Sequence, residues 1–167
     1  MTACKDIVLI SMLSSILIIS KEILAFLPNI ELVTFLIIIY TLIWGVRKTV
    51  FISVIFTLLQ IVLYGFGLWI LLYFLAWPFL SLLTNYFKKW LKDEFSLSLF
   101  SGLFGLIFGV FSAIPYFVID LNLGISYYIK GIPFDIIHCI GNYVVMMILF
   151  KPVYRNTKGL AEKYKFK

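Results

Sequence analysis

The stretch from Gly131 to Lys151 reads GIPFDIIHCIGNYVVMMILFK. Apolar residues fill most of it, as in a helix that spans a bilayer. Within it, Asp135, His138 and Asn142 are spaced i, i+3 and i+7, which places all three on one face of a helix. Polar groups at membrane depth are costly, so such a face turns towards a protein interior or a cavity. The stretch therefore predicts a membrane helix that lines a site.

Two prolines set the expected ends of this helix. Pro133 follows a turn signal and suits the first turn, where its missing N–H is not needed. Lys151 precedes Pro152, and a basic residue followed by proline is typical of a helix C-terminus. We therefore expect a helix over residues 133–150, with Asp135 in its first turn.

The composition of the whole chain indicates an all-α integral membrane protein. Of its 167 residues, 63% are hydrophobic and only 13% are charged, and the mean hydropathy is +1.08. A soluble domain of this length does not cover so much apolar surface. The apolar runs are long and continuous, whereas a membrane β-barrel would show short alternating strands. Because a span takes about 20 apolar residues, the chain has room for roughly six of them.

The six expected helices form one membrane domain over residues 1–167, and short loops connect them. The second and third helices are short for spans. The expected helices cover residues 6–26, 30–46, 49–64, 68–87, 95–118 and 133–150.

Positive charge recurs in every second connection, which predicts the orientation. Cytoplasmic loops carry an excess of Lys and Arg. Six spans with both termini in the cytoplasm therefore fit the alternation. The net charge of +6 is spread over these loops and does not indicate nucleic-acid binding. The basic residues of the expected cytoplasmic segments are Lys5, Arg47, Lys48, Lys88, Lys89, Lys92, Arg155, Lys158, Lys163, Lys165 and Lys167.

With this orientation, polar and aromatic residues gather on the outer side. Trp69, Tyr73 and Trp77 are spaced i, i+4 and i+8 on one face of the fourth helix. An aromatic cup with a few polar groups is the usual composition of a small-molecule site. The candidate substrate-binding residues are Asn29, Glu31, Tyr64, Trp69, Tyr73, Trp77, Tyr116, Tyr127, Asp135, His138 and Asn142.

Several of these residues have a structural alternative. Trp69 and the loop tyrosines fit an aromatic belt at the membrane surface. Asp135 fits a residue that stabilises the N-terminus of its helix. His138 and Asn142 fit hydrogen bonds between helices. On the fifth helix, small residues recur every four positions over 101–113, a pattern that lets another helix approach closely.

Catalysis is not expected from this sequence. Asp135 and His138 are a conceivable acid/base pair. However, the chain contains no HExxH, GxSxG or CxxC motif, and its one histidine does not build a zinc site with these neighbours. No P-loop is present either, so any ATP hydrolysis belongs to partners. We expect no enzyme activity and no cofactor. Cys4 and Cys139 are expected to stay unpaired.

Three features resemble the substrate-binding S components of energy-coupling factor (ECF) transporters, which take up vitamins across the bacterial cell membrane. They are the six-helix size, the segment LPNIELVTFLIIIYTLIWG at 27–45 and the segment GIPFDIIHCIGN at 131–142. The resemblance implies a vitamin-like substrate, a transmembrane coupling subunit and two ATPase subunits. It also implies that the whole S component topples in the membrane. Ser11 and Ser15 stand where the family commonly has alanines that dock the coupling subunit.

Two other functions remain open from the residues alone. One is a small membrane assembly protein whose polar groups only join helices. The other, more distant, is an intramembrane enzyme. Co-purifying ATPases would favour the S component, whereas turnover of a bound compound by the isolated chain would favour the enzyme.

Overall fold

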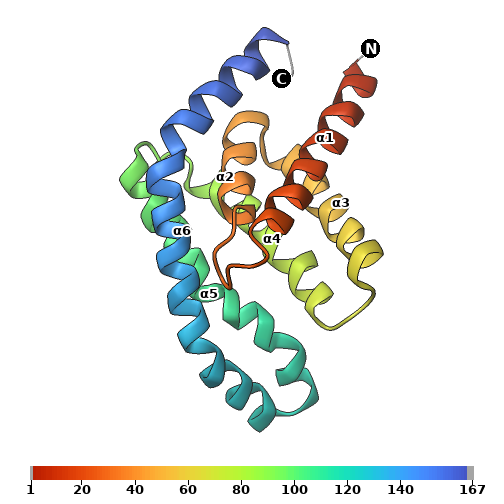
Figure 1. Ribbon diagram of the computed structural model, residues 1–167, viewed down its shortest axis with the longest axis vertical. Helices are drawn as coiled ribbons and strands as arrows, with labels where there is room; N and C mark the ends of the chain where they lie inside the picture. Colours follow the sequence, from red (N-terminus) through yellow and green to blue (C-terminus); the bar gives the residue numbers. More distant parts are fainter. Residues whose placement is uncertain (1, 165–167) are drawn as a thin grey trace.

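The computed structural model describes residues 2–164, which form six α-helices and no strand (Figure 1). The all-α expectation is therefore confirmed for this part of the chain. The helices are α1 (Thr2–Ile23), α2 (Val33–Trp44), α3 (Val46–Tyr64), α4 (Trp69–Phe87), α5 (Glu94–Ile119) and α6 (Leu121–Lys163).

Four of these helices, α3 to α6, are long and apolar enough to cross a membrane. The fold thus has the composition of an α-helical membrane protein. By contrast, α2 has only 12 residues, a length of about 18 Å. That is short of the roughly 30 Å of a hydrocarbon core. Helix α2 begins three residues after and ends two residues before the expected 30–46 helix, and it is not by itself a full span.

Local chemistry explains the shortness of α2. At its start, the carboxylate of Glu31 accepts hydrogen bonds from the backbone N–H groups of Val33 and Thr34. At its end, Gly45 has φ +85°, a left-handed conformation that glycine adopts without penalty and that ends helices. The same glycine separates α2 from α3.

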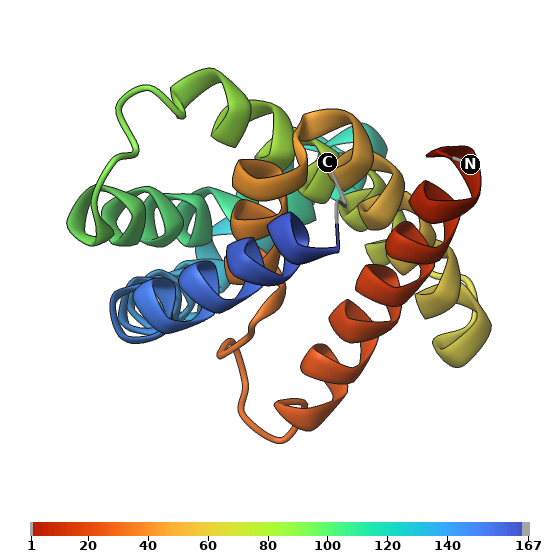
Figure 2. The same ribbon diagram turned by 90° about the horizontal axis from the view of Figure 1, so that it is seen from above.

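The short helix α2 is the centre of the fold. It contacts each of the other five helices, and its residues from Val33 to Thr41 are all buried. Around it, α1 packs mainly on α3, and α4 packs on both α3 and α5. In Figure 2, α1 stands on one side of the molecule and the α5–α6 pair on the other. The largest helix pairing is α5 with α6, which run antiparallel.

The sixth helix is much longer than the 133–150 expected from its prolines. It begins at Leu121, directly after Asp120, whose carboxylate accepts a hydrogen bond from the N–H of Leu123. Both Pro133 and Pro152 lie inside it. A proline removes one helical hydrogen bond, and membrane helices accept this loss where neighbouring groups compensate. The expected outer loop over residues 120–131 and the expected start at Pro133 are therefore wrong.

The helix ends form two groups in Figure 1. The start of α1, the α2–α3 junction, the α4–α5 loop and the end of α6 lie towards the top. We call this the basic end, formed by residues 2–6, 45–48, 88–93 and 151–163. The opposite end holds the three other connections, and its basic residues are Lys21 and Lys130. Those of the basic end are Lys5, Arg47, Lys48, Lys88, Lys89, Lys92, Lys151, Arg155, Lys158 and Lys163.

Candidate functional site

The aromatic stripe of α4 forms as expected. The ring of Tyr73 meets those of Trp69 and Trp77 edge-on, at centroid distances of 5.3 and 5.5 Å. Tyr73 also stacks on Phe56 of α3, and Trp77 packs against Phe108 of α5 at 5.2 Å. Because Trp77 is only 2% exposed, it lies well inside the protein, deeper than a belt at the membrane surface.

The polar face of α6 also forms as expected. Asp135, His138 and Asn142 are 8%, 4% and 1% exposed. The amide atoms of Asn142 have no hydrogen-bond partner among the described residues. The face therefore points into the protein, as its i, i+3, i+7 spacing predicted.

A carboxylate–imidazole contact links this face to the start of α2. Nε2 of His138 lies 3.3 Å from Oε1 of Glu31, the same carboxylate that receives the first N–H groups of α2. The His138 ring also meets Phe108 edge-on at 4.9 Å. His138 therefore has a structural partner, as its alternative interpretation anticipated, and Glu31 belongs to the same group of side chains.

Asp135 does not stabilise the N-terminus of α6, because that helix begins well before it at Leu121. Its carboxylate packs instead against Gly109 of α5. A Cβ placed on Gly109 would lie 1.9 Å from Oδ2 of Asp135. This Oδ2 atom is buried without a hydrogen-bond partner. The absence of a side chain at Gly109 thus makes the space that the carboxylate occupies.

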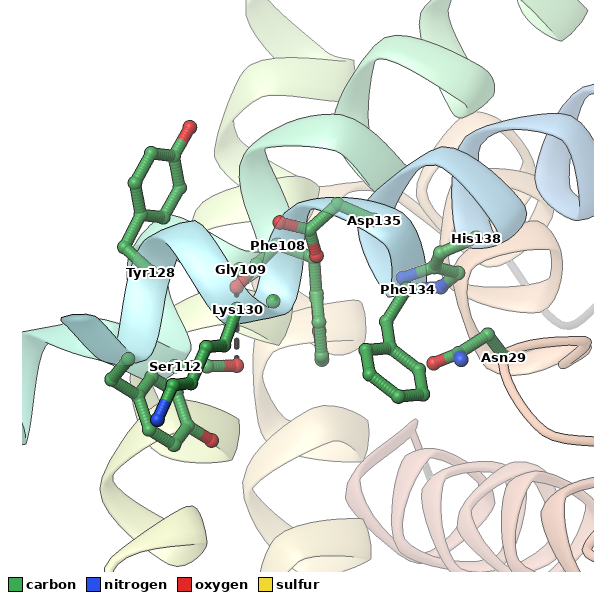
Figure 3. Close-up of a pocket in the computed structure, with 11 residues that line it drawn as sticks. Asn29, Phe108, Gly109, Ser112, Tyr128, Lys130, Phe134, Asp135 and His138 are labelled. Atoms are coloured by element: carbon green, nitrogen blue, oxygen red, sulfur yellow. Dashed lines mark hydrogen bonds between the residues drawn. The ribbon is translucent and has the colours of Figure 1, made fainter. Parts of the chain in front are cut away.

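Three cavities surround these residues at the opposite end of the fold. The largest of the three, about 400 Å³, lies along α6 and we call it the α6 cavity (Figure 3). It is lined by Asn29, Phe108, Gly109, Ser112, Tyr127, Tyr128, Lys130, Gly131, Phe134, Asp135 and His138.

The other two cavities, each about 280 Å³, adjoin the first one. The loop cavity lies under the α1–α2 loop, with Glu31, Tyr73 and Trp77 in its wall. It shares Asn29, Phe108 and His138 with the α6 cavity. The third, the tyrosine cavity, shares Ser112 and Tyr127 with the α6 cavity and is completed by Leu68, Trp69, Leu72 and Tyr116.

Asn29 occupies the boundary between two of these cavities. Its φ of +60° is a left-handed value that few residues other than glycine adopt. Its carbonyl oxygen would lie 3.3 Å from a Cβ placed on Gly141 of α6. The loop therefore rests on α6 at this point, and in Figure 3 Asn29 reaches the cavity from the side of His138.

Most of the expected site residues therefore come together, but two do not. Asn142 lies deeper along α6 and lines none of the three cavities. Tyr64 is 54% exposed, and its hydroxyl donates to the carboxylate of Glu22 on α1. Tyr116 and Tyr127 stack on each other at 3.9 Å, so they close one side of the tyrosine cavity.

The sequence did not predict much of the α6 cavity wall. From α5 it missed Phe108 and Ser112, because that helix was considered only for its small residues. From α6 it missed Lys130, because residues 120–131 were expected to form a loop, and Phe134, although this residue lay inside the expected 133–150 helix. The periodicity of Tyr127, Lys130 and Phe134 in the sequence was the available signal for a longer helix.

The available chemistry is that of binding by stacking and hydrogen bonds. Among residues 2–164, no group of three or more His, Cys, Asp or Glu side chains is placed to hold a metal ion. Cys4 and Cys139 are both free, as expected. The fold has the features of an α-helical membrane protein, and polar and aromatic residues line its cavities. Comparison with known protein families, curated proteins and solved structures finds no match.

Proposed function

We propose that the chain is the substrate-binding S component of an ECF-type transporter in the bacterial cell membrane. It captures a vitamin-like small molecule outside and delivers it inward with a transmembrane coupling subunit and two ATPase subunits. One observation carries the proposal: three adjoining cavities lie at the end of the fold that is poor in basic residues. Under the positive-inside rule, that end faces outward.

The size and lining of the cavities suit a small flat ligand. Binding sites for such ligands usually measure about 300–1,000 Å³ and combine apolar walls with a few polar groups. The α6 cavity falls in this range. In the loop cavity, Tyr73 and Trp77 offer ring surfaces for stacking. The indole N–H of Trp77 is buried and has no hydrogen-bond partner among the described residues.

The outer face of α1 suits the docking of a coupling subunit. Ser11 and Ser15 are both exposed there, and the hydroxyl of Ser15 donates to the carbonyl of Ser11. This bond satisfies the hydroxyl of Ser15 on its own helix. Two small residues one turn apart allow a partner helix to approach closely. Exposed Val8 and Met12 extend the apolar surface around them.

Ligand capture is testable by intrinsic tryptophan fluorescence of the purified chain. Saturable quenching by one compound from a panel of vitamins and nucleobase-like precursors is expected, because Trp69 and Trp77 line the cavities. His138→Ala should then weaken binding by about tenfold, the value of one hydrogen bond. Tyr86→Phe, an exposed change on α4 away from the cavities, should leave affinity unchanged. An unaltered affinity of His138→Ala would remove His138 from the site.

The partners are testable by co-purification from the native membrane. The chain should retain a coupling subunit and ATPases, and the double variant Ser11→Leu and Ser15→Leu should lose them. Ser126→Leu, an equally bulky change at an exposed position of α6, is the matched control. If no compound of the panel quenches the fluorescence and no ATPase co-purifies, a membrane assembly protein would be favoured instead.

A further inference from the structure

We propose that the α6 cavity selects ligands that present a cationic or hydrogen-bond-donating nitrogen to Asp135. The chemical class is amines, amidines and amino-substituted heterocycles, as opposed to carboxylates and phosphates. This inference rests on the proposed binding function and names the substrate class of the same site.

The first step concerns the Asp135 carboxylate, whose hydrogen bonding is incomplete. It lines the α6 cavity, is 8% exposed and has an Oδ2 atom without a hydrogen-bond partner. Its helix is one of the four that are long and apolar enough to cross a membrane. A buried ionisable group on such a helix is expensive unless it is paired, and it marks a functional position by default.

The second step concerns the two basic groups nearest to this carboxylate in the cavity wall, His138 and Lys130. His138 lies one turn further along α6, but its Nε2 is directed at Glu31. Lys130 lines the same cavity, yet it is exposed and forms no ion pair with Asp135 in the structure. In Figure 3 the Lys130 side chain extends towards Ser112, on the side away from His138. Among the described residues, neither of these two groups forms an ion pair with Asp135.

The third step concerns the rigidity of the site. The Asp135 carboxylate fills the space next to Gly109, where a side chain on residue 109 would collide with it. The close packing of α5 and α6 therefore fixes the carboxylate in place. The hydroxyl of Ser112 donates to the carbonyl of Phe108 on its own helix. Phe108 and Phe134 supply ring faces in the cavity wall. A flat ligand with a donor nitrogen at one edge would stack on these rings and donate to the Asp135 carboxylate. Aromatic rings also attract cations.

Three probes of one shape test this selectivity: benzamidine as the cation, benzamide as the neutral donor and benzoate as the anion. Their dissociation constants are measured by isothermal titration calorimetry with the full chain in detergent. Benzamidine should bind at least about tenfold more tightly than benzoate, since one charge-assisted hydrogen bond is sufficient for that ratio. Benzamide should lie between them.

A variant then assigns the selectivity to one carboxylate. Asp135→Asn keeps the shape of the side chain and should reduce benzamidine affinity about tenfold while benzamide affinity stays the same. Asp93→Asn is the matched control. It removes the same charge at the basic end, where Asn still accepts the hydrogen bond that starts α5. The control should preserve the order of the three probes.

Each remaining outcome overturns the inference. Benzoate binding as tightly as benzamidine would do so even if Asp135→Asn failed to fold, because that comparison needs only the native chain. An unchanged benzamidine affinity in a folded Asp135→Asn, or no benzamidine binding at all, would also overturn it. Different results would contradict the proposed transport role: no fluorescence quenching by any vitamin of the panel, and no co-purifying ATPases. A vitamin that binds through an anionic group would therefore contradict the inference on ligand class and leave the proposed transport role intact.

Discussion

At the scale of single residues, Glu31 serves two neighbours at once. Its carboxylate accepts the N–H groups that start α2 and also lies 3.3 Å from Nε2 of His138. The first contact fixes where the central helix begins. The second ties that helix to α6, 107 residues away in sequence. One side chain thus connects the cavity to the packing of the core.

Substitutions at this pair should separate the two contacts. Glu31→Ala should lower the free energy of unfolding by about 1–2 kcal/mol, because it removes both the cap and the imidazole contact. Glu31→Gln should cost less, since its amide oxygen still accepts the backbone N–H groups. A double-mutant cycle with His138→Gln should give a coupling energy of about 0.5–3 kcal/mol in denaturant unfolding. Additive effects would contradict the contact.

The residues of the site differ in how far sequence could place them. The shared face of Asp135, His138 and Asn142 was predictable because helical periodicity is local. The contact between Glu31 and His138 was not, since it joins distant segments through the fold. The role of Asp135 was misjudged for another reason. Asp135 was expected in the first turn of a helix that starts at Pro133. The helix instead starts at Leu121, directly after Asp120, so Asp135 lies well inside it.

At the scale of elements, the α5–α6 pairing depends on glycines. A Cβ on Gly105 would lie 2.8 Å from the backbone N of Cys139, which cannot move independently. A Cβ on Gly102 would meet its nearest atom at 3.2 Å. The repeat of small residues over 101–113 was visible in the sequence and is confirmed as a helix-packing surface. Its partner, α6, was not specified by the pattern.

Alanine substitutions should rank these glycines. Gly105→Ala should destabilise the protein by about 1–3 kcal/mol, the usual cost of overpacking, and Gly102→Ala should cost less. Gly159→Ala in the last part of α6 is the control. Nothing lies within 4 Å of its added Cβ, so it should be neutral or stabilise by up to about 1 kcal/mol. Equal effects at Gly102 and Gly105, measured by thermal unfolding, would contradict the ranking.

At the scale of the whole molecule, the connections separate into a basic end and an opposite end (Figure 1). The charge alternation that predicts this separation is readable from the loops alone, because consecutive helices run in opposite directions. The number of full spans is not readable in the same way. Helix α2 is short because Glu31 fixes its start and Gly45 ends it. These are local effects on the backbone, and a hydropathy profile barely registers them.

Cysteine labelling in intact cells should test the orientation. Cys4 is exposed near the start of α1 and should react with a membrane-impermeant maleimide only after permeabilisation. Phe66, in the α3–α4 connection, is 79% exposed. Phe66→Cys in a background without Cys4 should react in intact cells. Labelling of Cys4 before permeabilisation would reverse the proposed orientation, with the cavities then opening towards the cytoplasm.

The helices differ in length, so they match the thickness of a bilayer to different degrees. Helices α3 and α4 have 19 residues each, about 28 Å, close to the thickness of a hydrocarbon core. Helix α5 has 26 residues, about 39 Å, which exceeds the same core, and a helix of this length is accommodated by tilting, by kinking or by local thickening of the bilayer. We therefore expect lipid acyl-chain length to affect the tilt of the α5–α6 pair. Ligand affinity compared between short-chain and long-chain bilayers would measure that mechanical coupling.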